Sequence, residues 1–237
     1  MMPPVAGMIR PGEVIARIWA IYVREAALLL PAAVVLYGVQ FVVAVLAPVS
    51  VVALVTILFW VLAVLYQGFV VEIVAADQTG RRIGSQRELV RAVTPALGAL
   101  LAISILFGIG IFIGFVLIVI PGLILLTFWS VVVPVEVLER PGVFGSFGRS
   151  RELVRGHGWS VFGVIVLVYV AVLVVSFLAS LVAAPLGHFG RDLVQWAVNV
   201  AIAPVVAISA SVLYFALLAA GGQRLEPLGA PGGPPRG

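Results

Sequence analysis

Long runs of apolar residues restrict the fold of this sequence more than any other feature. A helix needs about 20 residues to cross a hydrocarbon core of roughly 30 Å, and the chain contains six runs of about that size. They cover residues 26–47, 49–76, 95–120, 122–138, 159–184 and 193–220. Strands of a membrane β-barrel would alternate apolar and polar side chains over about ten residues, whereas these runs are continuously apolar. The sequence therefore predicts an all-α polytopic membrane protein with six transmembrane helices, which together form one domain over residues 26–220.

The composition excludes a water-soluble domain. Of the 237 residues, 63% are hydrophobic and only 10% are charged, whereas soluble domains average about 25% charged residues. The 14 basic and 10 acidic side chains are too few to cover the surface of a soluble fold of this length. Cysteine is absent, which excludes disulfides, thiolate metal sites and cysteine nucleophiles.

The arginines alternate between the two ends of the predicted spans. Thirteen of the fourteen fall in segments that an even number of spans would place on one side, and Arg191 alone falls on the other. The positive-inside rule then places both termini in the cytoplasm, in a multi-pass protein of the cytoplasmic (inner) membrane. The N-terminus lacks the pattern of a secretory signal peptide, so we expect the first span to be retained. The Gly- and Pro-rich tail, residues 221–237, is expected to be disordered.

Segments that precede the spans are predicted to lie in the membrane interface as amphipathic helices on the cytoplasmic side. Residues 1–25 form the first such segment, in which Val14, Ile18 and Tyr22 recur at helical spacing. The sequence of residues 87–91, Arg-Glu-Leu-Val-Arg, recurs at residues 151–155 ahead of another span. This internal repeat suggests three units, each with a short interfacial helix followed by a transmembrane hairpin.

Charged residues in these segments form a candidate structural or lipid-headgroup network. Arg149, Glu152 and Arg155 are spaced by three, so that one carboxylate can lie between two guanidiniums on the same helix face. Such arginines can bind anionic lipid headgroups, or they can only set the topology and anchor the helix; the second reading is the simpler one. The full candidate set is Glu136, Glu139, Arg149, Glu152, Arg155, Arg87, Glu88 and Arg91.

The sequence offers little for catalysis. The two histidines, His157 and His188, fall in loops on opposite sides of the membrane, and no zinc-protease, nucleophile-elbow, P-loop or dinucleotide motif is present. We therefore predict a protein that is not an enzyme, with no catalytic residues, cofactor, metal or nucleic-acid partner. Gly110 and Gly114 have the small-xxx-small spacing that allows helices to approach closely.

Charges inside membrane spans are costly and often functional, which makes a small transporter or channel the alternative function. Its candidate residues are Glu72, Glu136 and Glu139, near a cavity that faces the cytoplasm, with Gln40, Gln67 and Asn199 as uncharged polar candidates. A salt-bridged network that holds interfacial helices against the bundle would explain the three glutamates without transport.

Residues 120–160 carry the pattern of a known family: Pro121-Gly122, a span that ends in Glu136 and Glu139, and an Arg149-Ser150-Arg151-Glu152-Leu153-Val154-Arg155-Gly156 segment before Trp159. This pattern resembles the membrane domain attached to some bacterial glycerophosphoryl diester phosphodiesterases, which also occurs in stand-alone relatives of unknown function. The resemblance implies a polytopic membrane module and not a phosphodiesterase. We expect a non-catalytic integral membrane protein that organises lipid or a protein partner through its arginine-rich interfacial helices. Its expected partners are membrane lipids, together with a protein partner or further copies of itself.

Overall fold

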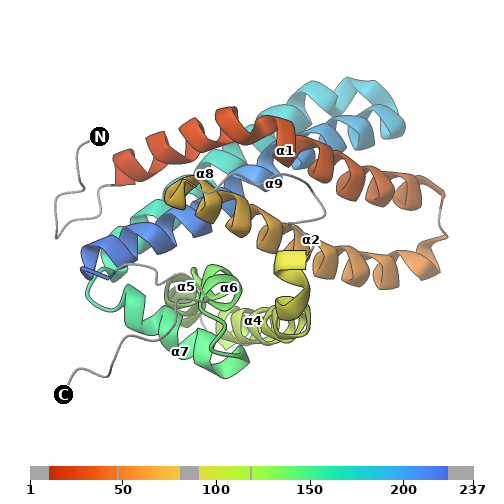
Figure 1. Cartoon of the computed structure of the whole chain (residues 1–237). Helices are drawn as coiled ribbons and strands as arrows, with labels where there is room; N and C mark the ends of the chain where they lie inside the picture. Colours follow the sequence, from red (N-terminus) through yellow and green to blue (C-terminus); the bar gives the residue numbers. More distant parts are fainter. Residues whose placement is uncertain (1–10, 47, 81–90, 118, 224–237) are drawn as a thin grey trace, which may run out of the picture.

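The computed structural model describes residues 11–46, 48–80, 91–117 and 119–223, and over these residues the chain is helical without strands. This confirms the predicted all-α class. The elements, shown in Figure 1, are α1 (Pro11–Leu46), α2 (Val49–Thr79), η1 (Thr94–Ala96), α4 (Leu97–Leu117), α5 (Val119–Phe128), α6 (Val132–Leu138), α7 (Val143–Val154), α8 (Gly158–Ala183), η2 (Ala184–Leu186) and α9 (Gly187–Ala220).

Within the described parts of the chain, four helical segments are long and apolar enough to cross a membrane. They are Pro11–Val43, Arg91–Val116, Ile120–Leu138 and Gly158–Ala220. The last contains 63 residues and comprises α8, η2 and α9. Large apolar side chains cover the outer surface of these segments, among them Phe112, Leu173 and Phe177. An exposed apolar surface of this extent suits lipid as the surrounding solvent.

The last helix, α9, is central to the packing. It contacts α1, α2, α6, α7 and α8, and its buried residues lie from Val200 onward. Figure 1 shows α1 running beside the α8–α9 hairpin, while α4 and α5 are viewed nearly along their axes. The start of α1, the start of α8 and the end of α9 lie at the same end of the molecule, on the left in Figure 1.

The helix boundaries differ from the sequence prediction in three places. Helix α1 continues from Pro11 to Leu46, so no helix end separates residues 11–25, the described part of the predicted N-terminal segment, from the first apolar run. The α4–α5 turn precedes Pro121, which lies in the first turn of α5, where its missing N–H costs nothing. The fourth apolar run is not one helix: α5 ends at Phe128 and α6 begins at Val132.

Helices α4 and α5 approach each other closely at glycines, as the small-xxx-small spacing predicts. A Cβ atom added to Gly114 would lie 2.9 Å from the Cα of Gly122, and one added to Gly110 would lie 2.4 Å from the ring of Trp129. Real Cβ atoms essentially never approach other atoms so closely. The absence of a side chain at these positions therefore allows the α4–α5 hairpin to close.

Candidate functional site

A polar network joins α6, α7 and α9. Glu139, directly after α6, accepts hydrogen bonds from Arg149 Nε at 2.9 Å and from the Tyr214 hydroxyl at 2.7 Å. Arg149 is also 3.6 Å from Glu152, and it donates a hydrogen bond to the side chain of Gln223 at 2.5 Å. One carboxylate thus links three helices, and both members of its ion pair are about three-quarters buried, with side-chain exposures of 23% for Glu139 and 27% for Arg149.

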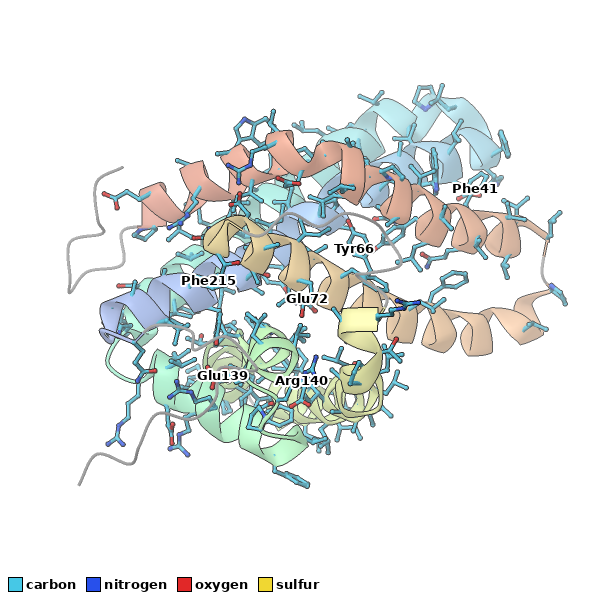
Figure 2. All side chains as sticks on the ribbon, viewed as in Figure 1. Phe41, Tyr66, Glu72, Glu139, Arg140 and Phe215 are labelled. Carbon is cyan, nitrogen blue, oxygen red and sulfur yellow. The ribbon has the colours of Figure 1, made fainter. Side chains whose placement is uncertain are left out.

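A tight turn places Arg149 against Glu139. Arg140 and Gly142 adopt positive φ angles of 53° and 82°, which reverse the chain between α6 and α7. Such a φ is unfavourable for a residue with a Cβ atom, and the guanidinium of Arg140 compensates by donating to the Ala92 carbonyl at 3.0 Å. Figure 2 labels Glu139 and Arg140 at this turn.

Two serines fix α7 against the elements before it. Ser146 donates to the buried carboxylate of Glu136 at 2.7 Å. Ser150 donates to the Phe128 carbonyl at 2.7 Å, and Phe128 is the last residue of α5. A helix end buried without a partner for its carbonyls is unfavourable, so the hydroxyl of Ser150 stabilises the break between α5 and α6.

The charges of α1 pair with the end of α2. Arg24 forms ion pairs with Glu25 and Asp77, and Arg17 donates a hydrogen bond to Gln78. Trp19 is exposed on the same part of α1 and stacks on Tyr22. The predicted N-terminal interfacial segment is therefore the first part of a long helix whose arginines hold the end of α2.

The electrostatics of Arg149 keep this network charged. Burial alone would lower the pKa of Arg149, but the hydrogen bond and negative charge of Glu139, together with Glu152, raise this pKa above its ordinary value. A cation with a raised pKa loses its stabilising contribution only as the pH rises through that raised value. No pH dependence from Arg149 is therefore expected at the pH values at which proteins are handled.

The outer face of α7 and the start of α8 combine aromatic and basic side chains. Phe144 is 81% exposed and Trp159 is 88% exposed, and Arg151 and Arg155 are exposed as well. The guanidinium of Arg151 lies 5.9 Å from the centre of the Phe128 ring, and Arg155 has no ion-pair partner among the described residues. The opposite face of α7 is buried, through Ser146, Ser150, Leu153 and Val154.

The structure brings together only part of the predicted candidate set. Glu136, Glu139, Arg149 and Glu152 meet where α6, α7 and α9 join. Arg91 is exposed ahead of η1, and Arg87 and Glu88 lie outside the described residues. No local sequence pattern predicts the roles of Ser146, Ser150, Tyr214 and Gln223, because their partners lie 10 to 75 positions away. The only signal for Tyr214 is a phenol hydroxyl near the end of a mostly apolar run.

Glu72, the third glutamate of the transport alternative, is buried in α2 and is labelled in Figure 2. The cavities between α1, α2 and α9, and between α2, α8 and α9, are lined by described residues other than Glu72, Glu136 and Glu139. Searches with this chain matched no protein-family model, no curated protein and no solved structure.

Proposed function

We propose that this chain is a non-catalytic integral membrane protein of the bacterial cytoplasmic membrane that binds anionic lipid headgroups through α7. The observation that carries the proposal is the outer face of α7 and the start of α8, where Phe144 and Trp159 lie exposed beside Arg151 and Arg155. Aromatic side chains favour the level of the headgroups, and guanidiniums at that level attract anionic lipids.

The pairing inside the network determines which arginines are available to lipid. Glu139 and Glu152 neutralise Arg149, and its place between helices makes it structural. Arg151 and Arg155 are exposed and form no ion pair with described residues, so their positive charges are available to lipid. Each basic group near an anionic membrane surface contributes about 1 kcal/mol to binding. The proposed lipid site therefore comprises Arg151 and Arg155, with Phe144 and Trp159 as anchors in the interface.

The glutamates belong in this proposal to the structural network and not to a transport path. Glu136 and Glu139 accept hydrogen bonds from serine, arginine and tyrosine. Partners within the protein therefore account for both carboxylates, without a transported ion. The resemblance of residues 120–160 to the membrane domain of the phosphodiesterases supports the same assignment, because it implies a membrane module without a catalytic site.

Six membrane crossings with both termini in the cytoplasm are part of the proposal. The arginines of α1 and α7 lie in segments near the end of the molecule where α1 begins and α9 ends, whereas Arg191 lies at the start of α9. This distribution supports a cytoplasmic location for the arginine-rich end.

Replacing both Arg151 and Arg155 with glutamine is expected to weaken binding of phosphatidylglycerol roughly thirtyfold, since two contributions of about 1 kcal/mol are lost. Native mass spectrometry of the purified protein, titrated with phosphatidylglycerol and with phosphatidylcholine, measures the change. Arg191→Gln is the matched control at the other end of the molecule, and its affinity should stay that of the unmodified protein. Equal phosphatidylglycerol binding by the double variant and the control would refute the lipid site.

Single cysteines test the topology cleanly, because the chain has no cysteine of its own. We expect a membrane-impermeant maleimide to label Phe189→Cys in spheroplasts, and to label Arg155→Cys only after the membrane is permeabilised. Both positions are exposed in the fold, so burial does not limit labelling at either site. Labelling of both cysteines from the same side would contradict the six-span topology.

A further inference from the structure

A cavity of about 210 Å³ lies between α2, α4, the α5–α6 break, α8 and α9. Most of its walls are apolar, and its polar lining residues are Gln67, Ser104, Ser130, Tyr169 and Ser209. None of its described lining residues carries a charged side chain. A largely apolar cavity with a few convergent polar groups is the usual form of a small-molecule site, and the absence of charge restricts the ligand to an uncharged molecule.

The polar groups of this cavity differ in what they can still bind. Ser104 and Ser209 donate to the carbonyls of Leu100 and Val206 in their own helices, at 2.7 Å and 2.6 Å. Toward a ligand, these two hydroxyl groups can therefore act only as hydrogen-bond acceptors. The buried Ser130 hydroxyl has no hydrogen-bond partner among the described residues. A buried polar group without a partner is unfavourable, and a ligand hydroxyl at Ser130 would supply the missing hydrogen bond.

The α5–α6 break contributes Trp129 and Ser130 to the cavity wall. Ser130 lies eight residues before the end of α6, or about 12 Å at the helical rise, which places the break within the hydrocarbon if residues 120–138 span the membrane. Irregular backbone at such depth is tolerated where it lines a cavity, and interrupted helices commonly form ligand sites in membrane proteins.

Gln67 lies in the wall of a second cavity as well. That cavity has a volume of about 270 Å³, lies between α1, α2 and α9, and shares Val64, Gln67 and Val206 with the first. Its other polar residues include Tyr37 and Asn199. The Gln67 amide has no hydrogen bond to other described residues, so it keeps both donor and acceptor capacity for a guest.

The surroundings of the first cavity indicate the route of entry. Its lining residue Tyr169 is 48% exposed on α8, and the neighbouring Val166 and Val170 are exposed too. This part of α8 belongs to the apolar outer surface, so a molecule reaching the cavity past Tyr169 comes from the lipid. A ligand that dissolves in lipid, carries no charge and bonds to hydroxyl and amide groups is an uncharged amphiphile.

We propose that the cavity beside the α5–α6 break binds the hydroxyl end of a neutral single-chain amphiphile. The ligand hydroxyl bonds to Gln67 and Ser130, and the chain leaves past Tyr169 along the outer face of α8. The proposal requires a membrane location for the chain, but it does not depend on lipid binding by Arg151 and Arg155. Each can therefore fail while the other holds.

Photolabelling in lipid nanodiscs tests the proposal. The probe is a long-chain alcohol with a diazirine close to its hydroxyl, and the matched probes are an alkane of the same length and a fatty acid. We expect the alcohol to label residues 129–133 and to be displaced by excess unlabelled alcohol. The alkane and the fatty acid should label the outer surface only. Labelling of the cavity by all three probes alike would overturn the proposal, because binding would then not depend on the neutral hydroxyl.

Two substitutions on α9 distinguish binding in the cavity from binding at the outer surface of the helix. Ala210 lines the cavity, so Ala210→Phe fills it and should reduce alcohol labelling of residues 129–133 at least tenfold. Ala201 is exposed on the same helix, so Ala201→Phe should leave labelling unchanged. If Ala210→Phe does not fold, Ser130→Ala decides the question, since it removes one oxygen and should reduce labelling several-fold. Undiminished labelling in the folded variant would refute the site.

Discussion

Replacing Glu139 with glutamine is expected to destabilise the protein by about 2–4 kcal/mol. Breaking a buried ion pair by neutralising one partner costs about 3–5 kcal/mol, and the residual exposure of Glu139 and Arg149 reduces this figure. The substitution keeps the shape of the side chain but leaves the guanidinium of Arg149 without the carboxylate that links α6, α7 and α9. The free energy of unfolding, measured by denaturant titration in detergent with tryptophan fluorescence, reports the loss.

Two further variants show whether the carboxylate acts as a link. Tyr214→Phe removes only the hydroxyl that donates to Glu139 and should cost about 1 kcal/mol. Combining Glu139→Gln with Arg149→Gln should cost less than the two single changes added together, because the double variant leaves no unpaired charge buried between the helices. A Glu139→Gln protein as stable as the original would contradict the structural network. If that stable protein had also lost the ability to carry a solute, the transport alternative would be supported.

Gly114→Ala is expected to destabilise the protein by about 1–3 kcal/mol, the usual cost of overpacking a well-packed contact. The added Cβ would meet the backbone of Gly122 at 2.9 Å, and a backbone atom cannot move aside as the end of a flexible side chain can. The α4–α5 hairpin would have to separate. Thermal unfolding of the purified protein measures the effect.

Gly98→Ala is the matched control on the same helix. A Cβ atom there would have no described neighbour within 4 Å, and alanine is favoured over glycine inside a helix by about 0.5–1 kcal/mol, less in the first turn, where Gly98 lies. Gly98→Ala should therefore raise the melting temperature, while Gly114→Ala lowers it. A rise or a fall in both variants alike would show that the helices do not meet at Gly114.

The sequence predicts features of this fold that depend on local composition. Continuous apolar runs coincide with the long helices because burial in lipid and helix formation both require many consecutive apolar residues. The close contact at Gly110 and Gly114 is predictable for a similar reason, since two small residues four apart lie on one helix face. The ion pair of Arg149 with Glu152 follows from the same helical spacing.

Features that depend on tertiary contacts were not predictable. Residues 122–138 are predominantly apolar and give no clear sign of a break after Phe128, which is stabilised by a hydroxyl 22 residues later in the chain. Glu139 and Tyr214 are separated by 75 positions, so no local pattern connects them. The boundary near residue 25 is predicted from a change from polar to apolar side chains. A helix can continue through such a change, because its backbone hydrogen bonds do not depend on side-chain polarity. Pro31 does not interrupt α1 either.

The position of α9 in the molecule has a consequence for biosynthesis. This helix contacts α1, α2, α6, α7 and α8, yet the ribosome synthesises it after all of them. Before α9 is synthesised, the faces of α1 and α8 that pack against it are uncovered. We therefore expect the earlier helices to associate only loosely until α9 is added. A chain that ends before residue 200 would lack the buried part of α9, and the faces of α1 and α8 that pack against it would stay uncovered.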